Sequence, residues 1–170
     1  MHPLRDASKI VVGCVALSCL LGWAVDLVTA HVAVEYFTVH HPHVLDSQSP
    51  LVMALVWGFI ASWWCGLIAG VILALVNHRL TPPLPPTQIL RWVAKGCAAI
   101  WFTMMAVLAA IYLVAGIVPL AQRRASFESD RRLMAVALAH MGEYILAAIA
   151  VAIIAVLVVR ESKRLRRANP

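Results

Sequence analysis

Four long runs of apolar residues, each nearly free of charge, dominate the sequence. They extend over residues 10–39, 51–76, 96–118 and 133–159. About 20 residues of α-helix cross a hydrocarbon core of about 30 Å, so every run is long enough to span a bilayer. None shows the alternation of polar and apolar residues that is typical of a membrane β-barrel. The sequence therefore predicts an all-α, polytopic membrane protein with one domain over 1–170, a bundle of four transmembrane helices.

Composition excludes a water-soluble globule. The chain is 62% apolar and 13% charged, with a mean hydropathy of +0.85. Soluble domains are about 45–50% apolar and about 25% charged. The net charge of +6 gathers in short segments without interleaved aromatic residues, which argues against nucleic-acid binding. The predicted partner is the lipid bilayer, whose anionic headgroups attract each Lys or Arg by about 1 kcal/mol.

The positions of Lys and Arg predict the orientation. Ten of them lie in the N-terminal segment, in the second loop with the helix entry after it, and in the C-terminal tail. The first loop has none, and the third has four: Arg123, Arg124, Arg131 and Arg132. By the positive-inside rule, both termini are expected in the cytoplasm of a bacterial inner membrane. All four cysteines lie inside the apolar runs, where they are expected to pack as small buried residues.

The second apolar run carries a ridge of small residues. Its members recur every four positions along the whole run: Ala54, Gly58, Ser62, Gly66, Gly70 and Ala74. In lipid, such a stripe lets a neighbouring helix backbone approach closely. The ridge is therefore predicted to be either the packing centre of the bundle or a face that docks a second copy or another membrane protein.

Ionisable residues inside the spans are the candidate functional residues, because a charge at bilayer depth costs at least about 2.5–3.5 kcal/mol. Asp26 lies about 25 Å beyond Lys9, and Glu143 lies about 25 Å before Arg160. The first and last spans therefore bring acidic and imidazole side chains to one outer layer. The other members of this layer are His31, Glu35, Tyr36, Tyr112, His140 and Tyr144.

Spacing suggests a metal or haem site in this layer. His31 and Glu35 are four residues apart, and His140 and Glu143 are three apart, so each pair shares a helix face. These four residues are candidate ligands for zinc, copper or iron, and the two histidines are candidate axial ligands for haem b. The three tyrosines and Asp26 would surround them. On a straight helix Asp26 points about 140° away from His31 and needs another neighbour.

Three other interpretations stay open. The polar residues could simply hydrogen-bond one another, or serve as a proton or solute pathway in a small transporter that acts as an oligomer. The protein could also be a non-catalytic assembly subunit that docks through the ridge. His40, His41 and His43 in the outer loop are predicted to form an interfacial cluster rather than to capture a metal. The signatures of a phosphate loop, a nucleophile elbow and His-Glu-x-x-His do not occur, and the sequence leaves open whether the protein is an enzyme.

Three segments resemble a set of small, uncharacterised four-helix proteins of bacterial inner membranes. They read EYFTVHHP at 35–42, SPLVMALVWGFIASWWCGLIAG at 49–70 and AHMGEY at 139–144. The resemblance implies the four-helix fold and the inner membrane, and it implies no activity. The positions that it singles out are Glu35, Tyr36, Trp57, Trp63, Trp64, His140 and Tyr144.

Overall fold

Four helical segments long and apolar enough to cross a membrane make up the molecule. The computed structural model describes residues 3–116 and 125–168, and the side chains of 4–111, 113 and 131–168. The candidate spans are Leu4–Val32, Pro50–His78, Pro86–Ile111 and Arg131–Ala168. The all-α, four-span prediction is confirmed. The side chain of Tyr112 lies outside the described part of the chain.

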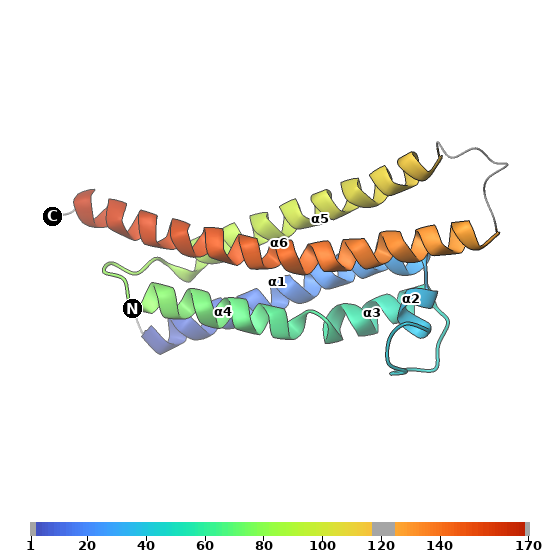
Figure 1. Ribbon diagram of the computed structural model, residues 1–170. Coiled ribbons are helices and arrows are strands. Elements are labelled where there is room, and N and C mark those ends of the chain that lie inside the picture. The colour runs from blue at the N-terminus through green and yellow to red at the C-terminus, as the bar shows by residue number, and fades with distance from the viewer. Residues whose placement is uncertain (1–2, 117–124, 169–170) are drawn as a thin grey trace.

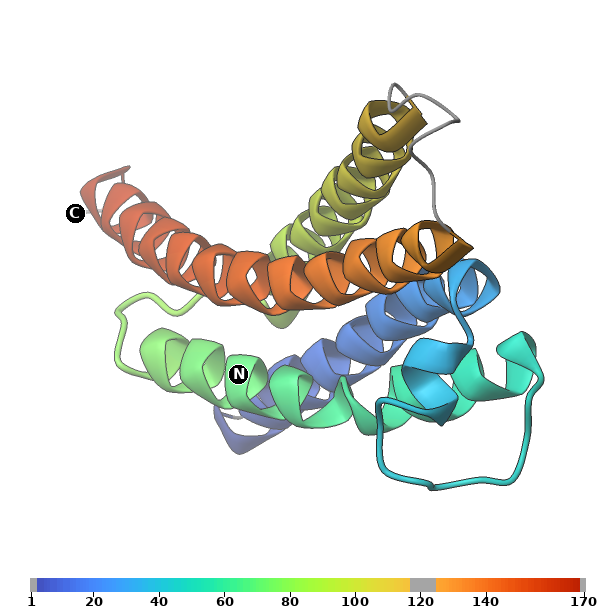
Figure 2. The same ribbon diagram turned by 45° about the vertical axis from the view of Figure 1, so that its right-hand side comes forward.

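Six helices form these spans and the first loop. They are α1 (Pro3–Val32), α2 (Glu35–Thr38), α3 (Pro50–Ile60), α4 (Trp63–His78), α5 (Pro86–Gly116) and α6 (Ala125–Ala168). Helices α3 and α4 pack along one side of α1, α5 packs along another, and α6 packs mainly against α5 and α4 (Figure 1). Towards its C-terminal end, α5 diverges from the other helices (Figure 2). Both described ends of the chain and the α4–α5 connection lie at the same end of the bundle (Figure 1).

The ridge of small residues packs inside the bundle. All six members are buried, and Ala54 is completely covered. A Cβ atom added to Gly66 would lie 2.6 Å from Cα of Val15, and one added to Gly70 would lie 2.7 Å from Cα of Val11. The two backbones thus approach as closely as glycine permits. The ridge is the seam between α1 and the α3–α4 segment, and this burial leaves no ridge surface for docking a partner.

Two helices that the sequence predicts as continuous are interrupted. The first ends at Val32, and Glu35 begins the separate helix α2. The second is broken at Ala61 and Ser62, where the Ser62 N–H bonds to the carbonyl of Phe59, three residues back. α1 also lies close to this break, since a Cβ on Gly22 would lie 2.6 Å from the Gly58 carbonyl oxygen. Backbone contact at the seam therefore coincides with the interruption.

The last two helices extend beyond the predicted spans. Helix α5 begins at Pro86 rather than at residue 96, because proline fits the first position of a helix and Arg91 and Lys95 do not interrupt it. Helix α6 extends beyond both predicted ends, 133 and 159, since charged residues continue a helix outside the apolar segment. The predicted end of the third span, residue 118, lies outside the described residues.

Candidate functional site

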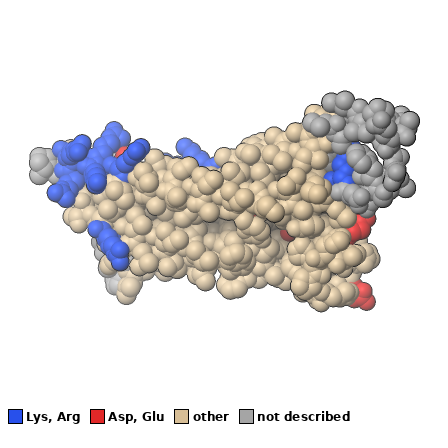
Figure 3. All heavy atoms as spheres, viewed as in Figure 1, with Lys and Arg blue, Asp and Glu red and all other residues tan. Residues whose placement is uncertain are grey.

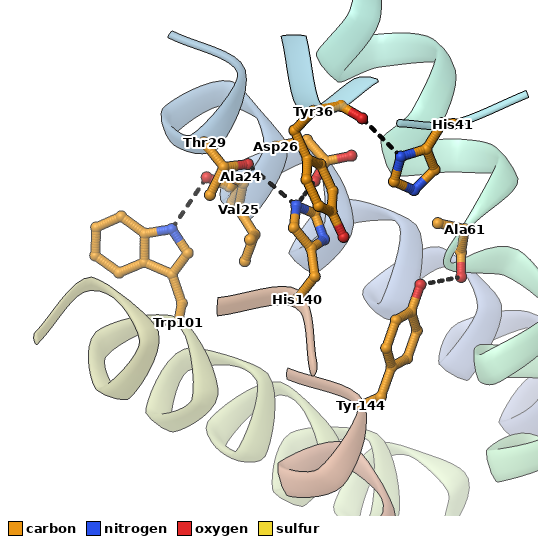
Figure 4. Close-up of polar contacts among 10 residues, drawn as sticks. All are labelled: Ala24, Val25, Asp26, Thr29, Tyr36, His41, Ala61, Trp101, His140 and Tyr144. Carbon is orange, nitrogen blue, oxygen red and sulfur yellow. Dashed lines mark hydrogen bonds and ion pairs between the residues drawn. The ribbon is translucent and has the colours of Figure 1, made fainter. Parts of the chain in front are cut away.

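An acid–imidazole pair lies buried between the first and last spans. Asp26 of α1 is 2% exposed and His140 of α6 is 9% exposed. Asp26 Oδ1 lies 3.5 Å from His140 Nε2. Thr29 Oγ1 lies 3.4 Å from the same nitrogen and donates its own proton to the Val25 carbonyl. A proton on His140 Nε2 would therefore face two acceptors, the Asp26 carboxylate and the Thr29 hydroxyl oxygen (Figure 4).

Aromatic rings connect this pair to the loop after α2. The Tyr36 ring stacks on His140 at a centroid distance of 5.0 Å and an interplanar angle of 13°. On its other side Tyr36 contacts His41 at 4.6 Å, and His41 Nδ1 lies 2.8 Å from the Tyr36 carbonyl oxygen. The His41 ring in turn meets Trp57 of α3 at 4.7 Å. Figure 4 shows Tyr36 between the two imidazoles, so a chain of polar rings leads outward from Asp26.

The phenol of Tyr36 retains its proton at physiological pH. Burial raises the pKa of Tyr36 above its usual value near 10, and the nearby Asp26 carboxylate raises it further. Both effects disfavour the phenolate. Tyr36 is therefore suited to stacking and to donating a hydrogen bond, and it is a poor base.

A second acid lies one helical turn from His140. Glu143 is 8% exposed. No described side chain or backbone group forms a hydrogen bond or ion pair with its carboxylate. It lies within electrostatic range of Asp26 and of the thiols of Cys65 and Cys97. Two carboxyl groups thus share a region of the membrane-spanning part with one imidazole.

The structure does not bring the four candidate metal ligands together. His31 is exposed, and its Nδ1 lies 2.6 Å from the Leu27 carbonyl oxygen of its own helix. Glu35 lies 3.5 Å from the guanidinium of Arg132. Because α1 ends before Glu35, this acid and His31 do not share a continuous helix face. Among the described residues, no group of three or more His, Cys, Asp or Glu side chains is arranged to hold a metal ion. Of the two candidate haem ligands, His31 is exposed, whereas His140 is buried beside Asp26.

The remaining predicted site residue, Tyr144, lies further along α6. Its hydroxyl donates to the Ala61 carbonyl at 3.4 Å, at the break between α3 and α4. Its ring stacks on Trp64 at a centroid distance of 6.0 Å. Tyr144 therefore ties α6 to α4, and it does not contact the Asp26–His140 pair in Figure 4.

Sequence reasoning missed two members of the site. Asp26 was expected to need a neighbour, and that neighbour is His140 itself. Thr29 could have been found, since it lies three residues after Asp26 and shares its helix face. His41 was predicted only as part of an interfacial cluster, because its contact with Tyr36 depends on the path of the chain after α1.

Comparisons with known proteins identify no relative. No family model matches the chain, and no curated protein or solved structure matches it either. The fold and the geometry of the buried residues are therefore the basis for any functional conclusion.

Proposed function

We propose that this protein is a small membrane transporter in which the Asp26–His140 pair takes up and releases a proton. The observation that supports this proposal is the burial of both groups inside candidate spans, 3.5 Å apart. Within the described chain, His140 is the only ion-pair partner of Asp26. Ionisable groups at such depth require a partner or a task, and acid–histidine chains are typical of proton relays.

The chemistry needs only proton transfer between oxygen and nitrogen. When His140 Nδ1 accepts a proton, Nε2 can pass its own proton to the Asp26 carboxylate, and this leaves a neutral imidazole and a protonated acid. His41, whose ring contacts Tyr36, is the next imidazole towards the outer loop. Other titratable groups that face this region are Glu143 and Tyr144 on α6, Cys65 on α4 and Cys97 on α5.

The distribution of charge supports an orientation with both termini in the cytoplasm. Lys and Arg gather at the end that holds the termini, and the face seen in Figure 3 has an uncharged band towards the other end. The α4–α5 loop lies at the same basic end and is fixed there by Ser162, whose hydroxyl donates to the Pro82 carbonyl at 2.7 Å. We therefore place the Asp26–His140 pair near the outer face of a bacterial inner membrane.

Because four helices make only a small bundle, we propose that the transporter acts as an oligomer. The ridge is buried against α1, so a second copy would contact another face of the bundle.

Proton flux into vesicles tests the function. Purified protein is reconstituted into liposomes that enclose a pH-sensitive dye, and a potassium diffusion potential drives proton entry. We expect entry faster than in protein-free liposomes, and we expect Asp26→Asn to reduce it to that background, because the amide cannot exchange a proton.

Asp6→Asn is the matched control. Asp6 pairs with Lys9 at the basic end of α1, where it is outside the buried layer. This variant should retain the wild-type rate. Wild-type flux equal to background, or an Asp26→Asn rate equal to the wild-type rate in correctly folded protein, would contradict the proposal.

A further inference from the structure

An apolar groove lies beside the buried acids. It has a volume of about 360 Å³ and is bounded by α1, α4, α5 and α6. Its walls include the thiols of Cys14, Cys65 and Cys97 and the small side chains of Ala147 and Ala150. A volume of this size is within the range of small-molecule sites. Since the groove lies within the spans, its ligand must be one that is soluble in the hydrocarbon core.

Glu143 lies on α6 next to Tyr144 and one helical turn before Ala147, and both of these residues line the groove. Ala147 and Ala150 follow it by four and seven residues, so the three positions share one face of α6. Cys65 and Cys97, which are within electrostatic range of Glu143, line the groove from α4 and α5. An acid more than nine-tenths buried, with no hydrogen-bond partner among the described residues, thus lies within one helical turn of an apolar volume.

Aromatic rings form part of the wall near this acid. Trp64 and Tyr144 both line the groove, and their rings are stacked at an interplanar angle of 25°. The faces of such rings attract cations, with the indole as the strongest. A carboxylate and two aromatic rings together favour a positive ligand over a neutral lipid tail, and they oppose an anionic one.

We propose that the groove binds a lipophilic organic cation, whose positive centre pairs with Glu143 and whose apolar groups fill the space between α4, α5 and α6. This inference rests on the proposed transport function and names its substrate class. Burial of the carboxylate makes an unpaired charge there unfavourable, so Glu143 holds either a proton or the cation. Cation entry then releases one proton, and cation release takes one up.

Several titratable groups surround the carboxylate for which the proton and the cation compete. The titratable groups that face Glu143 are Asp26 on α1, His140 and Tyr144 on α6, Cys65 on α4 and Cys97 on α5. Lowering the pH protonates carboxylates in this set, and it therefore weakens cation binding.

Binding of tetraphenylphosphonium to the full chain in lipid nanodiscs tests the inference. We expect saturable binding above that of empty nanodiscs, an affinity that falls as the pH is lowered, and release of a proton on binding. Glu143→Gln should weaken binding by about tenfold or more and remove the pH dependence, because the amide carries no charge. Ala148→Phe should also weaken binding, since this exposed alanine lines the groove and a ring there narrows it.

Tetraphenylborate is the matched probe, because it has the same shape and the opposite charge. We expect it to bind far more weakly than the cation. Equal binding of the two ions, or no effect of Glu143→Gln in folded protein, would overturn the inference. If proton flux depends on Asp26 and the cation does not bind, the inference fails and the proposed transport function stands. If the cation binds through Glu143 and Asp26→Asn leaves proton flux unchanged, the site stands and the proton role of Asp26 fails.

Discussion

The two sides of α1 are packed in opposite ways. On the side of α3 and α4, glycines bring backbones into direct contact, and a Cβ at Gly66 would lie 2.7 Å from the Cys14 carbonyl oxygen. On the side of α5 and α6, the same helix faces a groove of about 360 Å³. Within lipid, close van der Waals contact is what holds helices together. The α3–α4 side therefore supplies cohesion, and the α5–α6 side leaves volume for a ligand.

The buried ionisable groups follow the same division. Asp26 faces His140 of α6, and Glu143 is on α6 as well. The ridge on α3 and α4 contributes one polar member, Ser62, to its seam. Small apolar residues on the α3–α4 side need no polar partner. Buried carboxyl groups on the α5–α6 side need a proton or a cation to neutralise their charge. The α3–α4 side is therefore the scaffold and the α5–α6 side holds the candidate site. Three substitutions, two of them with a comparison variant, test this difference.

The largest expected effect is on the tight side. Gly66→Ala places a methyl group 2.6 Å from Cα of Val15, and this neighbour is backbone that cannot rotate away. Overpacking of this kind typically destabilises by about 1–3 kcal/mol, and we expect about 3 kcal/mol here. The free energy of unfolding in mixed micelles measures it.

Gly96→Ala is the matched control on the open side. Both glycines line the groove, but the methyl group on Gly96 would lie 3.7 Å from Cβ of Ala150, an ordinary contact. We expect no loss of stability, and a gain of up to about 1 kcal/mol, because alanine is the better helix former. Equal losses for the two variants would show that the two sides of α1 do not differ in packing.

An intermediate effect is expected where the two sides are joined. Asn77, at the end of α4, accepts from the Leu84 N–H at 2.8 Å and donates to the Leu84 carbonyl at 3.0 Å. Asn77→Ala leaves both buried backbone groups without partners and should cost about 2 kcal/mol. Asn77→Asp keeps the acceptor but places a second carboxylate oxygen against the Leu84 carbonyl oxygen, so it should cost at least as much. A loss of under about 0.5 kcal/mol for Asn77→Ala would show that these two hydrogen bonds do not hold the α4–α5 loop.

The fold could be predicted from the sequence because the hydropathy of a segment indicates whether it lies in lipid or in water. Four apolar runs were sufficient to predict four spans, and spacing was sufficient to identify the ridge from Ala54 to Ala74. The breaks after Val32 and at Ala61 were not predictable. No proline or glycine occupies either break, and the one at Ala61 lies beside a close contact with α1 that the sequence does not reveal.

The depth of the site residues in the membrane could be predicted, but the directions in which their side chains point could not. Residue spacing placed Asp26 and His140 at similar levels, but the rotation of α1 relative to α6 depends on packing along the whole seam. The early end of α1 then turned Glu35 towards Arg132, and this separated it from the predicted metal ligands. A pattern read along one helix does not contain such information.

The smallest expected effect is at the rim of the groove, where the two sides of α1 meet again. Tyr144→Phe removes a hydroxyl that donates to the Ala61 carbonyl at 3.4 Å, and it leaves the stack on Trp64 in place. Tyr144 is 39% exposed and its hydrogen bond is long, so we expect a loss of under about 1 kcal/mol in the free energy of unfolding. Binding of tetraphenylphosphonium should change by less than in Glu143→Gln, because the aromatic face remains. A loss as large as that of Gly66→Ala would mean that α4 and α6 are held together by this contact, and the open side would then share the cohesion assigned here to the seam.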